Sequence, residues 1–111
     1  MAGLKYYRNN AAATAGDNYL YIELPENGVL RKLRIRNQTK GWQTGAAFLS
    51  LTSLTADNPE NIGIVKEIQD GPAFSVNWDG ELKLGEYRRL IAGLYNCDAS
   101  DQILVTAGVE I

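Results

Sequence analysis

The densest group of chemically active side chains is a run of five cations in ten residues, namely Arg31, Lys32, Arg34, Arg36 and Lys40. In an extended segment, alternation places Lys32, Arg34 and Arg36 on one face, and we call these three residues the basic stripe. Such a stripe could bind phosphates or an acidic protein surface. We rank a solvated face balanced by acids such as Glu23 first, an acidic protein contact second and nucleic acid third, because no motif of stacked aromatics accompanies the stripe.

Aromatic side chains form a second group with binding chemistry. Trp42 falls in a polar loop between residues 38 and 45, and the tyrosines include Tyr19 and Tyr21. Trp and Tyr anchor many protein interfaces, and stacked aromatics on β-sandwiches can also bind sugars. For each tryptophan we rank packing in the core or at a sheet edge first, an interface second and a sugar site third.

The residue types needed for most catalysis are missing or scattered. The chain has no histidine, so the commonest general base and metal ligand is missing. Cys97 is the only cysteine, and we interpret it as a small, partly buried hydrophobic residue. The 13 acidic residues are dispersed among turns without a local acid–base pair. We therefore expect no enzymatic activity, no catalytic residues, no metal and no cofactor.

Length and charge narrow the class of protein. At 111 residues the chain has the size of one domain, and its net charge of −2 argues against bulk affinity for nucleic acid or anionic membranes. No stretch approaches the roughly 20 apolar residues of a spanning helix. The leader carries Asn9 and Asn10 where a signal peptide would be apolar, so we expect no export by the Sec route.

Hydrophobic alternation predicts an all-β fold. Residues 19–24 place Leu20, Ile22 and Leu24 on one face, and about eight such segments recur with turn residues between them. The expected strands cover residues 19–24, 29–37, 46–54, 62–68, 74–78, 82–84, 87–95 and 102–111. No amphipathic helix of ten or more residues is evident. The pattern favours an antiparallel β-sandwich of the jelly-roll or a related Greek-key type, with a partly open barrel as the alternative.

Turn chemistry suggests two hairpins. A two-residue Asn27-Gly28 turn would pair Ile22 with Leu33 and keep one face apolar. A three-residue turn over 78–80 would pair the strands on either side of it and lift Trp78 onto the turn.

The last strand is expected to carry five inward residues, Ile103, Val105, Ala107, Val109 and Ile111. The C-terminal end is therefore predicted to be a structural element of the sandwich.

The first 17 residues, MAGLKYYRNNAAATAGD, are predicted to be an extended N-terminal arm outside a single β-sandwich domain of residues 18–111. The arm is too short and too polar to bury a core of its own. Leu4, Tyr6 and Tyr7 are its expected anchors, with Arg8 beside them. An extended segment of this kind can lie along a partner or extend its sheet.

Most of the chain resembles a known class of proteins in its layout. Four parts of the chain, the leader and the segments LPENGVLRKLRIRNQ, FSVNWDGELKLGEYRRL and DQILVTAGVEI, carry the similarity. Together they resemble the small β-sandwich virion proteins of tailed bacteriophages, of the capsid decoration or cement type. This resemblance implies a non-enzymatic virion structural protein, assembled in the host cytoplasm, that stabilises the capsid lattice. The implied partner is the major capsid protein or another virion protein. The implied state is a homo-oligomer, with a trimer favoured, and neither a membrane nor nucleic acid is expected as a partner.

Eight residues are candidates for that contact: Leu4, Tyr6, Tyr7, Arg8, Lys32, Arg34, Arg36 and Trp42. Two other functions stay open. One is a carbohydrate-binding β-sandwich that uses Trp42 and Trp78, and the other is a tail or head-to-tail connector subunit.

Overall fold

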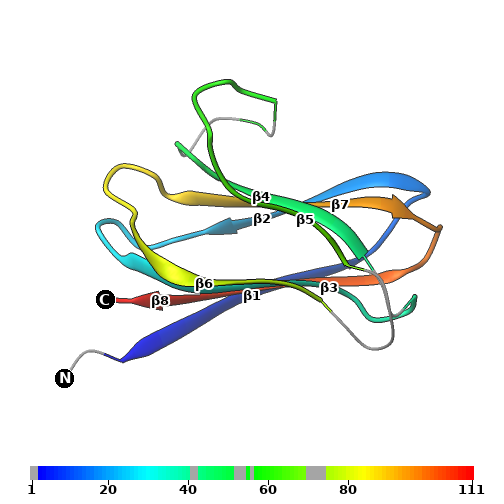
Figure 1. Ribbon diagram of the computed structural model, residues 1–111, viewed down its shortest axis with the longest axis horizontal. Helices are drawn as coiled ribbons and strands as arrows, with labels where there is room; N and C mark the ends of the chain where they lie inside the picture. Colours follow the sequence, from blue (N-terminus) through cyan, green and yellow to red (C-terminus); the bar gives the residue numbers. More distant parts are fainter. Residues whose placement is uncertain (1–2, 41–42, 52–54, 56, 70–74) are drawn as a thin grey trace.

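Two four-stranded antiparallel sheets pack face to face in the computed structural model (Figure 1). The structure describes residues 3–40, 43–51, 55, 57–69 and 75–111. The strands are β1 Leu4–Ala12, β2 Gly16–Glu23, β3 Val29–Asn37, β4 Gln43–Ser50, β5 Ile62–Gln69, β6 Ser75–Lys83, β7 Arg89–Cys97 and β8 Gln102–Glu110. Within these described ranges there is no helix of a length and apolarity that would cross a membrane.

The strand order is that of a jelly roll. One sheet has the order β1-β8-β3-β6 and the other β2-β7-β4-β5. Consecutive strands alternate between the two sheets, except that β4 and β5 are neighbours in the same sheet. This is the arrangement of eight strands in two interlocked Greek keys, and it confirms the predicted all-β, antiparallel sandwich.

The core lies between the sheets and is filled by the inward residues of both. Leu20, Ile22 and Leu24 are buried, as their alternation predicted. In β8 the alternate residues from Ile103 to Val109 are also buried, whereas Ile111 is 68% exposed, so the expectation of a fifth inward residue there was wrong. Ile111 lies beyond the last residue of β8, where no partner strand covers it.

The N-terminal segment is extended, as predicted, but the prediction that it lies outside the sandwich was wrong. It forms β1, which pairs with β8 from Leu4 opposite Glu110 to Ala12 opposite Gln102. The physical reason is that β8 would otherwise present a row of unpaired N–H and C=O groups at a sheet edge. The nine residues of β1 satisfy these groups, although none of their side chains is fully buried.

The Asn27-Gly28 segment does not close a hairpin. β2 pairs with β7, whereas β3 pairs with β6 and β8, so Ile22 and Leu33 lie in different sheets. The two apolar faces meet across the sandwich instead of side by side. Asn27 takes a left-handed conformation, with φ of 60°, in the connection between the sheets.

The expected turn at residues 78–80 is the middle of one strand. β6 runs through it, and Trp78 lies opposite Leu33 and packs against the core. The register between β3 and β6 shifts near Gly80, so the bulge predicted at this glycine is present, but within a strand and not in a turn. Phe74, which was expected to begin this strand, lies outside the described residues.

A second irregularity, at Arg31 of β3, changes which residues are buried. β3 has one more residue than β8 between Leu30 and Lys32. Leu30 is therefore fully buried, whereas the expected inward residue Val29 is only half-buried. The outward positions Lys32 and Arg34 keep the predicted alternation.

Candidate functional site

A cationic groove lies on the outer face of the β1-β8-β3-β6 sheet. Its cations are Arg8 from β1 and Lys32, Arg34 and Arg36 from β3. Its other lining residues are Tyr6, Leu33, Asn77, Trp78, Asp79, Leu104, Thr106 and Gly108. Residues that are far apart in the sequence thus meet because β8 brings β1 and β3 to either side of it.

Strand register fixes the layout of the groove. Thr106 of β8 has Arg8 beside it on β1 and Arg34 beside it on β3. Adjacent strands lie about 4.8 Å apart, so the Cα atoms of these two arginines are separated by about 10 Å. Alternate residues of one strand are about 6.5 to 7 Å apart, which sets the spacing along the basic stripe.

The floor of the groove is formed by β8 and its walls by longer side chains. Gly108 lies opposite both Tyr6 and Lys32. A Cβ atom at Gly108 would come within 3.0 Å of Tyr6 Cε1 and 3.4 Å of Lys32 Cβ, so the tyrosine ring packs against the bare backbone. Any larger residue there would narrow the channel.

The groove concentrates positive charge on an acidic protein. Four cations and the carboxylate of Asp79 give it a formal charge of +3, while the whole chain carries −2, so the remaining residues carry −5. Within the described part of the chain, none of the four groove cations forms an ion pair. Arg34 donates from Nε to Asn77 Oδ1 at 3.1 Å, a bond that leaves its charge uncompensated.

The other two cations of the run lie elsewhere and have acidic partners. Arg31, at the bulge, lies 3.1 Å from Glu110 Oε1 and 3.8 Å from Glu81 Oε2. Lys40 Nζ lies 3.4 Å from Asp98 Oδ2. The run of five cations therefore divides into three that face solvent together and two that are engaged in local ion pairs.

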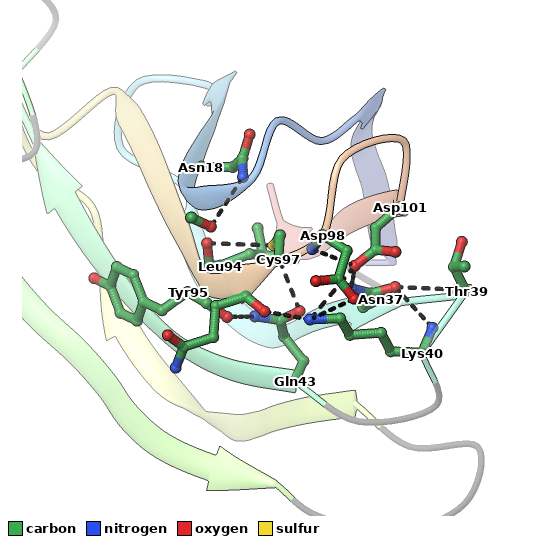
Figure 2. Close-up of polar contacts among 12 residues, drawn as sticks. Asn18, Asn37, Thr39, Lys40, Gln43, Leu94, Tyr95, Cys97, Asp98 and Asp101 are labelled. Carbon is green, nitrogen blue, oxygen red and sulfur yellow. Dashed lines mark hydrogen bonds and ion pairs between the residues drawn. The ribbon is translucent and has the colours of Figure 1, made fainter.

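A polar cluster closes one end of the sandwich around the buried Asp101 (Figure 2). Its Oδ2 accepts hydrogen bonds from Asn37 Nδ2 and from the backbone N–H of Asp98, each at 2.9 Å, and Lys40 Nζ lies 3.7 Å away. Burial alone would raise the pKa of Asp101, but these hydrogen bonds and the lysine charge together lower it. The cluster joins the β3–β4 and β7–β8 connections, and we interpret it as structural.

Cys97 lies beside this cluster and is buried. Its Sγ is 3.6 Å from the carbonyl oxygen of Leu94 and 3.9 Å from Gln43 Oε1. Burial raises the pKa of the thiol, which disfavours the reactive thiolate. Within the described ranges, no group of three His, Cys, Asp or Glu residues is arranged to hold a metal ion.

The outer face of the other sheet carries tyrosines. The rings of Tyr19 and Tyr95 are 6.2 Å apart and nearly perpendicular, and the guanidinium of Arg89 lies 5.5 Å from the centre of the Tyr21 ring. Burial, followed by the proximity of Tyr19, raises the pKa of Tyr95 to about 12. The perpendicular rings do not form the flat platform on which a sugar would stack.

The structure brings together five of the eight candidate contact residues, Tyr6, Arg8, Lys32, Arg34 and Arg36. Tyr7 points the other way and packs against the core, so it is not an exposed anchor. Leu4 is half-buried at the start of β1 and does not line the groove, and Trp42 lies outside the described residues.

Sequence reasoning missed the contributions of β6 and β8 to the groove. Thr106 and Gly108 alternate with inward residues of β8 that were identified, so their outward direction was available from the sequence. Their position between β1 and β3 could not be predicted from the sequence, because it depends on the order of the strands in the sheet.

Comparisons with known proteins leave the family open. No family model matches the chain, and no curated protein matches it. Among solved structures, the K3 cleaved adhesin domain of Lys-gingipain from Porphyromonas gingivalis w83 aligns with a TM-score of 0.48 and 17% identity, over 91% of this chain and 71% of that chain. A likeness of this degree carries no functional argument.

Proposed function

We propose that the protein is a non-enzymatic structural protein that binds an acidic surface of a partner protein through the cationic groove. Because the sequence resembles capsid decoration proteins of tailed bacteriophages, the proposed setting is a phage capsid that the protein decorates and stabilises. The observation that carries the proposal is the convergence of Arg8 with the basic stripe on one face, without ion pairs within the described residues.

The chemistry of the groove suits binding. Arginine presents several N–H donors in a planar fork, which pairs with carboxylates in a bidentate manner. Exposed ion pairs contribute only about 0 to 1 kcal/mol each, so one groove on one partner is a weak contact. On a lattice, an oligomer that engages several sites at once gains avidity without any new contact. This is the situation expected of a decoration protein.

The copy number in purified phage particles tests the setting. Quantitative mass spectrometry should find this chain at a number that scales with the major capsid protein. Six or twelve copies per particle would instead identify a connector or tail subunit. Absence from the particles would contradict a virion role altogether.

A charge-reversal pair tests the groove. Purified R34E should occupy empty shells at least tenfold less than the wild type, because it replaces an attraction with a repulsion at the centre of the basic stripe. The control K83E makes the same charge change at an exposed residue of β6 that does not line the groove, and it should bind normally. Equal occupancy by R34E and K83E would show that the groove is not the contact.

The carbohydrate alternative relied on Trp42 and Trp78. Trp78 is partly buried against the core and also lines the cationic groove, and Trp42 lies outside the described residues. We do not propose sugar binding as the function.

A further inference from the structure

We propose that the groove binds an extended acidic segment of the partner protein, which lies along β8 and carries carboxylates on alternate residues. This inference rests on the proposed function and names the kind of surface that the groove recognises. It is drawn from the shape, spacing and charge of the groove.

The shape of the groove favours an extended chain. Between β1 and β3 the floor is β8, whose outward positions are Leu104, Thr106 and the bare backbone of Gly108, and Asn77 and Asp79 of β6 line the groove on the far side of the basic stripe. Long side chains stand on both sides, with Tyr6 and Arg8 on β1 and the basic stripe on β3. The walls are about 10 Å apart between Cα atoms, two strand spacings, which is close to the width of one peptide chain with its side chains.

The spacing of the cations matches a peptide in the same conformation. Lys32, Arg34 and Arg36 repeat every two residues of a strand, about 6.5 to 7 Å. Alternate residues of an extended ligand have the same repeat, so three carboxylates at i, i+2 and i+4 can each meet one cation. An acid on an intervening residue points to the opposite side and would face Arg8.

The hydrogen bonding of Arg34 prepares it for this role. Asn77 accepts from Nε, which restrains the guanidinium and leaves its two Nη groups for a carboxylate. Asp79 lies directly opposite Lys32 and lowers the positive charge at that end of the groove. We therefore expect the most acidic part of the segment to lie toward Arg34 and Arg36.

A stacked nucleic-acid strand fits less well. Single-strand binding surfaces usually add several exposed stacking aromatics, whereas this groove has Tyr6 exposed and Trp78 partly buried against the core. The carboxylate of Asp79 would also repel a polyanion of uniform charge.

Titrations followed by two-dimensional NMR of the ¹⁵N-labelled full chain can test the inference. The probes are two eight-residue peptides of equal composition, one with Glu and Thr alternating and one with four Thr followed by four Glu. An oligothymidylate with four phosphates serves as the third probe. At low salt, the alternating peptide should bind at least fivefold more tightly than the block peptide and should shift the amides of β1, β3 and β8. R34E should weaken its binding at least tenfold, while K83E should change it less than twofold.

The outcomes separate the inference from the proposed function. Equal binding of the two peptides, or no binding of either at millimolar concentration, would overturn the extended acidic segment. Tighter binding of the oligothymidylate would overturn it in favour of nucleic acid. The shell experiment with R34E and K83E decides the proposed function by itself, because it uses the assembled partner and no peptide.

Discussion

At the scale of single residues, Asp101 shows how a buried charge is accommodated. A carboxylate with 5% of its side chain exposed would normally be strongly unfavourable. Here the charge accepts a side-chain and a backbone hydrogen bond and has Lys40 nearby. Because these partners belong to two different connections, the carboxylate holds together the end of the sandwich.

Replacing Asp101 with alanine should therefore be costly. We expect D101A to lower the free energy of unfolding by about 2 to 4 kcal/mol, because Asn37 and the Asp98 amide lose an acceptor and Lys40 loses a charge partner. The matched change D98N affects the other acidic partner of Lys40, whose side chain is 80% exposed, and should change stability by less than about 0.5 kcal/mol. Urea unfolding of both variants measures the contrast, and equal effects would refute a structural role for Asp101.

The buried carboxylate of Asp101 also predicts how the stability of the protein changes at acid pH. The pKa of Asp101 is lowered in the folded state, so its charge stabilises the protein above the ordinary value of 3.8. This stabilisation is lost as the pH falls through the lower, folded-state pKa. The stability difference between wild type and D101A should consequently be larger at pH 7 than at pH 3. A difference that stays constant would contradict the assignment.

The raised pKa of Tyr95 predicts how the stability of the protein changes at alkaline pH. Its pKa is raised from 10.0 to about 12 in the folded state, so the folded protein retains a proton that the unfolded chain loses. Stability should therefore fall as the pH rises from about 10 to about 12. Absorbance at tyrosinate wavelengths should show a late-ionising group that is missing in Y95F. An unchanged titration curve of Y95F above pH 11 would show that another residue is responsible.

At the scale of elements, β1 is the strand whose role changed most between sequence and structure. It has no fully buried side chain, and alternation along it is weak, which is why it was predicted to be free. Its pairing is decided by the unpaired edge of β8, a property of another segment. Deleting β1 would therefore expose that edge, so truncation is a poor test of partner binding.

Two adjacent tyrosines test how β1 is seated. Tyr7 packs against the core, so Y7A should lower the free energy of unfolding by about 1 to 3 kcal/mol. Tyr6 is 55% exposed on the groove side, so Y6A should change stability by no more than about 0.5 kcal/mol. Thermal or urea unfolding distinguishes them. Equal losses would contradict the register of β1.

The strands show what the sequence can and cannot predict. Alternation identifies the inward face of strands such as β2 and β8, because burial on one face follows a period of two, and β3 was predicted with its observed bounds. Alternation does not identify the neighbouring strand, so Ile22 and Leu33 were predicted to pair although they lie in different sheets. The basic stripe was predictable because it depends only on alternation within β3. The groove was not predictable because it depends on which strands lie beside β8.

At the scale of the whole molecule, the separation of charge matters more than the net charge. The chain has a net charge of −2 and a pI near 5.0, yet one outer face carries a groove of +3. Exposed charges more than about 8 Å apart are largely screened at physiological salt. A partner at this face therefore meets a local positive field, and the acidic remainder of the surface opposes it only weakly.

This separation of charge predicts an unusual behaviour on ion-exchange resins. At pH 7 and about 0.1 M salt, the wild-type protein should be retarded on a sulfonate resin in spite of its negative net charge, because the groove cations lie within one screening length of about 10 Å and more distant acidic residues are screened. R34E should elute without delay. K83E has the same formal charge of −4, since each variant replaces one positive charge with one negative charge, and it should still be retarded. Loss of retardation in both variants would mean that net charge alone governs the interaction. Retention of R34E would place the positive field on another face.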